Sequence, residues 1–147
     1  MKHISLQQTR LPLGDILNYI GQPKDSPGKI KALAENNTSA MRNFCRLAFG
    51  KADPFEDIRA GGHIPESWDS RIENGVSTES FYDLVKQLAK VADKSHNMLA
   101  RRDALLDILE WTSREEAEMV LAIVNRRFQT PKLPRLVVHA VYPELNA

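Results

Sequence analysis

The chain has 147 residues, of which 42% are hydrophobic and 27% charged, and its formal net charge is +1. This length fits one domain with a buried core, and the composition excludes a disordered chain. No apolar run approaches the roughly 20 residues of a membrane span, and the N-terminus lacks the apolar stretch of a signal peptide, so we expect a cytoplasmic protein. The single cysteine, Cys45, excludes an internal disulfide, and its apolar helical surroundings predict a buried thiol.

Apolar residues with helical spacing begin early in the chain. Three helices are predicted in the first third, at about residues 13–20, 26–35 and 39–49. Ser26 is the expected N-cap of the second helix because Pro27 then takes the first helical position, and Thr38 is the expected N-cap of the third. Gly50 follows the third helix, where we expect a left-handed residue to end it.

Between Lys51 and Ser77 the helical spacing disappears, and several prolines and glycines predict a long loop with at most one helical turn. Loops of this length inside compact domains are often functional. A fourth helix is expected to open at Ser77 or Thr78, and a fifth to carry apolar residues up to Trp111. Ser113 then begins a capping box, which predicts the start of a sixth helix.

The last helix is predicted to start near Pro134 and to stop at Tyr142, because the residue before a proline disfavours helical backbone. Its expected apolar face comprises Leu133, Leu136, Val137, Ala140 and Val141. The adjacent valines in this segment are also compatible with a short strand. Together the elements predict an all-α, compact bundle of about six to seven helices in a single domain over residues 1–147, with its core at about 12–145.

The small net charge hides an uneven distribution. Residues 1–51 hold eight Lys and Arg against three acids, residues 119–147 hold four against one, and the middle of the chain is acidic. If the two ends meet in space, they create a positive face on a roughly neutral body. The candidate phosphate-binding residues are Arg126, Arg127, Lys132 and Arg135 near the C-terminus, and Arg42, Arg46 and Lys51 near the N-terminus.

Lys132 and Arg135 lie at the approach to a predicted helix N-terminus, where unpaired backbone N–H groups and the helix dipole favour an anion. The alternative interpretation is an ordinary solvated helix end. Arg42 and Arg46, one helical turn apart, have the same alternative of serving only solubility.

The titratable residues form no catalytic pattern. The histidines at 3, 63, 96 and 139 are scattered, so we expect no metal site. No serine has a Gly-x-Ser-x-Gly context, and no glycine loop precedes a Gly-Lys-Ser/Thr sequence. We therefore expect a protein that is not an enzyme and needs no cofactor. The alternative is a site hidden in the loop at 53–69, with His63 as its titrating group.

Two parts of the chain resemble a known family. The sequences are GKIKALAENN at 28–37, MRNF at 41–44 and LAF at 47–49, and near the end RRF at 126–128 and VYPEL at 141–145. They resemble the opening and closing helices of the N-terminal helical DNA-binding domain of ATP-dependent DNA ligases from T-even bacteriophages. The layout is also similar to small uncharacterised stand-alone proteins of tailed phages.

The resemblance implies binding of duplex DNA through its backbone, mostly across the minor groove. It does not imply ligation, because the chain has no Lys-x-Asp-Gly nucleophile motif and no room for a nucleotidyltransferase domain. The chain departs from the ligases at Glu144, where they carry a small residue, and at Pro131 and Pro134, where they present small Gly or Ser residues to phosphate. Lys132 and Arg135 are expected to supply side-chain contacts there instead.

Two functional hypotheses follow. The first is a non-enzymatic, phage-type accessory protein that holds duplex DNA by its phosphates. The second is a module that binds a host or phage protein through the acidic loop at 53–73, with Phe55 and Trp68 as exposed contact residues. In that segment the two aromatic rings are equally compatible with simply covering the bundle.

Overall fold

The computed structural model describes residues 11–65 and 80–146, and within them it contains eight α-helices, one 3-10 helix and no strand. The elements are α1 (Leu13–Ile20), α2 (Ser26–Glu35), α3 (Ser39–Phe49), α4 (Glu56–Ala60), α5 (Phe81–Ala92), α6 (Met98–Trp111), α7 (Arg114–Val124), α8 (Arg135–Val141) and the 3-10 helix η1 (Pro143–Asn146). The predicted all-α bundle is confirmed. The structure has one helix more than predicted, the short α4, which lies inside the predicted loop.

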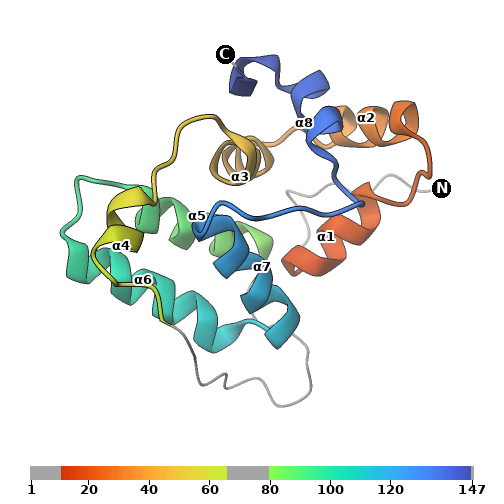
Figure 1. Cartoon of the computed structure of the whole chain (residues 1–147). Coiled ribbons are helices and arrows are strands. Elements are labelled where there is room, and N and C mark those ends of the chain that lie inside the picture. Colours follow the sequence, from red (N-terminus) through yellow and green to blue (C-terminus); the bar gives the residue numbers. More distant parts are fainter. Residues whose placement is uncertain (1–10, 66–79, 147) are drawn as a thin grey trace.

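Helix α3 lies near the middle of the bundle (Figure 1). Helix α5 packs against both α3 and α6, whereas α2 and α8, far apart in the sequence, pack against each other. The centre is aromatic: the Phe44 ring lies 5.6 Å from the Phe81 ring and 6.1 Å from the Phe128 ring, and Phe49 lies 5.6 Å from Phe128. Such pairs contribute about 1 kcal/mol each beyond their burial. They join α3 to α5 and to the connection between α7 and α8.

Polar side chains begin several helices by accepting from backbone N–H groups. The predicted caps Thr38 and Ser113 are confirmed, with Oγ to N distances of 3.1 and 3.2 Å to the third residue beyond. The predicted cap Ser26 is wrong: Asp25 accepts from the Gly28 N–H at 2.7 Å, and its carboxylate also complements the helix dipole. Helix α5 is capped by Ser80 and begins after the predicted start, which lies outside the described residues.

Two other predictions are corrected. Gly50 is not left-handed: its backbone is extended, with φ −66° and ψ 153°. Leu136 and Ala140 are not on the buried face of α8 but exposed, Leu136 by 71%, because the buried residues of this short helix are Val137 and Val138. The predicted bounds of α8, from near Pro134 to Tyr142, are confirmed. In the part of the chain that is described, no helix has the length and apolar character to cross a membrane.

Candidate nucleic-acid interface

The C-terminal end of α3 is closed by side chains from distant parts of the sequence. Arg126 donates from Nη1 to the Leu47 carbonyl at 3.1 Å and from Nη2 to the Gly50 carbonyl. The Leu47 carbonyl is one of those that a left-handed glycine turn would otherwise satisfy, whereas the Gly50 carbonyl lies just beyond the helix. A guanidinium at this position also complements the negative end of the helix dipole. This is why Gly50 leaves the helix in an extended conformation.

Arg126 itself occupies the left-handed region, with φ 60°. It follows α7, where its N–H donates to the Ile123 carbonyl at 3.1 Å and the next N–H, of Arg127, donates to the Ala122 carbonyl at 2.7 Å. This pattern is a Schellman motif with arginine where glycine is usual. The backbone strain, about 1–2 kcal/mol, is offset by the contacts of the side chain with α3. Arg126 therefore holds α7 against α3, and its guanidinium is already engaged.

Arg135, the first residue of α8, reaches the same end of α3. Its Nη1 donates to the Phe49 carbonyl at 3.1 Å, and its guanidinium carbon lies 5.7 Å from the centre of the Phe49 ring. His139, one turn along α8, places Nε2 3.4 Å from the same carbonyl oxygen. Unlike Arg126, Arg135 remains exposed. Its charge is held in place and is still accessible to a ligand.

Three more cations extend from the outer side of α3. Arg42 and Arg46 lie one turn apart on its exposed face, and Lys51 follows just after its end. Arg46 and Lys51 line one recess of about 370 Å³. We call Arg42, Arg46, Lys51 and Arg135 the α3 basic surface. Among the described residues, no carboxylate forms an ion pair with any of the four.

The α3 basic surface combines cations from both ends of the sequence. The C-terminal segment lies against the region around α3. The Lys51 N–H donates to the Leu145 carbonyl at 3.1 Å, and the Tyr142 hydroxyl donates to Asn37 Oδ1 at 2.9 Å. Glu144 consequently lines the recess with Arg46 and Lys51. In the sequence, Glu144 stands out only as a departure from the ligase ending. The packing of the C-terminal segment places this carboxylate beside the cations.

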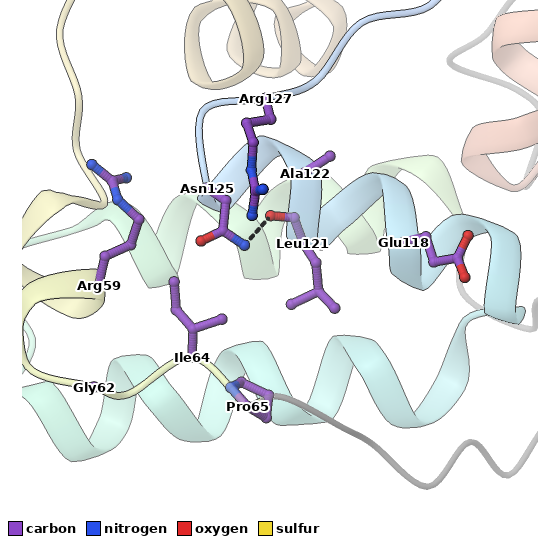
Figure 2. A pocket seen from close by; sticks show the side chains of 9 residues that line it. All are labelled: Arg59, Gly62, Ile64, Pro65, Glu118, Leu121, Ala122, Asn125 and Arg127. Carbon is purple, nitrogen blue, oxygen red and sulfur yellow. Dashed lines mark hydrogen bonds between the residues drawn. The ribbon is translucent and has the colours of Figure 1, made fainter.

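The remaining two sequence-predicted cations lie elsewhere. Arg127 is exposed and lines an open groove of about 740 Å³ between α7 and the segment after α4, together with Arg59, Ile64 and Leu121 (Figure 2). Lys132 is half-buried, and its backbone lies so close to Gly21 that a Cβ there would be 2.9 Å from the Lys132 Cα. Four of the seven predicted residues are thus exposed charges on α3 or in contact with its C-terminal end. The structure gives Arg126 an internal role and separates Arg127 and Lys132 from the group.

Two acids at the start of the predicted acidic loop, Asp53 and Asp57, are paired with arginines. Asp53 binds Arg59 through both carboxylate oxygens, and Arg59 also donates to the Val124 carbonyl at the end of α7, at 2.8 Å. Asp57 accepts from Arg101 at 2.7 and 3.0 Å. These hydrogen bonds hold the pKa of both carboxyl groups below the usual range. Segment 53–59 therefore connects the first turn of α6 with the C-terminal end of α7.

Phe55 corrects the interaction hypothesis for this loop. Its side chain is 0% exposed and belongs to the core, because the turn before α4 directs the ring inward. The prediction of an exposed contact residue at Phe55 is wrong, and the alternative that it covers the bundle is confirmed. Trp68, the other predicted contact, lies outside the described residues.

The described residues contain no group of three or more His, Cys, Asp and Glu side chains that could hold a metal ion. Cys45 is buried, as predicted, and burial raises the pKa of its thiol to about 12. His63 is half-buried on the segment after α4.

No protein-family model matches the chain, and no curated protein or solved structure matches it either.

Proposed function

We propose that this chain binds duplex DNA through its phosphates, as a non-enzymatic accessory protein that does not read base sequence. The observation that carries the proposal is the α3 basic surface, in which four exposed cations from both ends of the chain lie without a described carboxylate partner. Cations arranged in this way match the closely spaced charges of a DNA backbone. The resemblance to the DNA-binding domain of phage ligases supports the same proposal and suggests a phage-encoded protein.

The geometry changes the residues expected to carry binding. Arg126 is removed from the contact set because its guanidinium already donates to α3 and lies near Asp53, with 22% of its side chain exposed. Arg42, Arg46 and Lys51 become the main contacts. A module that binds a protein partner through segment 53–73 is the weaker alternative, since Phe55 is buried there.

Fluorescence anisotropy with a labelled duplex tests the proposal. Engaging two to four phosphates releases their counterions, so the logarithm of the binding constant should fall against the logarithm of salt with a slope of about −2 to −4. Absence of binding to duplex at about 50 mM salt would refute the proposal.

A matched pair of charge reversals locates the surface. Arg46→Glu/Lys51→Glu should abolish most binding and make the salt slope shallower. Lys86→Glu/Lys90→Glu, on the exposed side of α5, changes the net charge equally and should leave most of the affinity. If both double variants weaken binding to the same degree, the effect belongs to overall charge and the proposed surface is wrong.

A further inference from the structure

The exposed side of α8 carries a large apolar side chain beside the α3 basic surface. Leu136 is 71% exposed and directly follows Arg135. Most of the leucine side chain is therefore in contact with water. The next two residues, Val137 and Val138, are fully buried.

The backbone that carries Leu136 is held in place by its neighbours. Arg135 is anchored on the Phe49 carbonyl and ring, and the buried valines fix the other side of the helix against α2 and α3. An apolar side chain on a fixed helix loses little conformational entropy when it enters a ligand. This distinguishes Leu136 from a leucine on a loose loop.

We propose that Leu136 is a wedge that enters the minor groove and partly unstacks a base step when the α3 basic surface binds DNA. The inference rests on the proposed function and adds a deformation of the DNA to it. Minor-groove proteins insert leucine and similar side chains between base pairs while flanking cations hold the backbone, and the duplex kinks by about 20–90°. Flexible pyrimidine–purine steps such as TA are the easiest to open, so the wedge adds a preference for such steps without base contacts.

Charge selects DNA as the occupant of this apolar position. Leu136 lies next to the exposed cation Arg135, and the nearest acid along the chain is Glu144, eight residues away. A partner that approaches Leu136 must therefore offer negative charge outside and an apolar interior, as a minor groove does with its phosphates and stacked bases. Leu99 serves as the comparison, since it is 63% exposed on α6, where the next turn carries both a cation and an acid, Arg102 and Asp103.

The test measures binding and bending in the same samples. A duplex of about 30 base pairs carries a donor and an acceptor dye at its ends and a central TA step, so that anisotropy reports binding and energy transfer reports the bend. Saturating wild-type protein should increase energy transfer. Leu136→Ala should remove the increase and weaken affinity at most about tenfold, because burial of the leucine is partly offset by the cost of unstacking. Leu99→Ala should behave as the wild type in both measurements.

The outcomes separate the two proposals. Wild-type protein that binds but leaves energy transfer unchanged overturns the wedge alone, as does Leu136→Ala protein that bends the duplex as strongly as the wild type. Wild-type protein that does not bind at all overturns the proposed function and the wedge with it. Replacing the central TA step by an A-tract should reduce wild-type affinity severalfold and leave Leu136→Ala affinity nearly unchanged. An equal loss for both proteins also counts against the wedge.

Discussion

Replacing Arg126 by alanine removes the side chain that joins the end of α7 to the end of α3. The guanidinium makes two hydrogen bonds to α3 carbonyls and lies 3.9 Å from Asp53, with 22% of the side chain exposed. Hydrogen bonds from a charged donor contribute about 1.5–3 kcal/mol each, and partial exposure reduces this, so we expect a loss of about 2–4 kcal/mol. For a chain of this length the Tm should fall by roughly 5–15 °C.

Replacing Arg126 by glycine separates the stability contributed by the side chain from the cost of the left-handed backbone. Arg126→Gly loses the same hydrogen bonds, but a residue at φ 60° is strained unless it is glycine. The glycine variant should therefore be more stable than the alanine variant by about 1 kcal/mol. Without this strain the order would be reversed, because glycine has more freedom in the unfolded chain.

Urea denaturation followed by circular dichroism measures both differences. Arg127→Ala is the control, because Arg127 is the next residue and is exposed, and its stability should stay within about 0.5 kcal/mol of the wild type. An alanine variant at position 126 that is as stable as this control would show that the contacts with α3 contribute nothing. A glycine variant less stable than the alanine variant would refute the argument from the left-handed backbone.

Three further predictions concern the other charged groups. Arg101 is 2% exposed and paired with a carboxylate, so Arg101→Ala should cost about 3–5 kcal/mol in urea denaturation, whereas Arg102→Ala on the exposed side of α6 should change little. Hydrogen bonds from Arg59 lower the pKa of Asp53, so this carboxylate stabilises the fold above its unfolded pKa of about 4, and the stabilisation is lost as the pH falls through the lowered folded value. Asp53→Asn should therefore lower the Tm at pH 7 and flatten its decline below about pH 4, and a decline as steep as that of the wild type would contradict the linkage. Glu144→Gln removes a carboxylate from the recess with cationic walls and should tighten duplex binding about twofold to fivefold in low-salt anisotropy titrations, and unchanged affinity would place the DNA elsewhere.

The candidate site shows where sequence reasoning ends. Composition and position predicted seven basic residues on one face, and three of them, Arg46, Lys51 and Arg135, lie around the end of α3, with Arg42 one turn before Arg46. Adjacent residues have opposite roles: Arg126 turns its side chain into α3, and Arg127 points into the groove on the other side of α7. The Schellman turn after α7 decides this, and no propensity predicts an arginine at its left-handed position.

The sequence alone determined most helices of this protein, although not α4 or the cap of α2. Apolar spacing and caps such as Thr38 and Ser113 depend on residues within one or two turns, so the boundaries of α1, α3 and α8 could be read directly. The tertiary structure alone decided which charges are free. Arg59, Arg101 and Arg126 look in the sequence like any surface arginine, yet each reaches a carbonyl at the end of a distant helix. A long, flexible side chain carries little local information about its partner, because the partner is set by which helix ends the packed core brings within its reach.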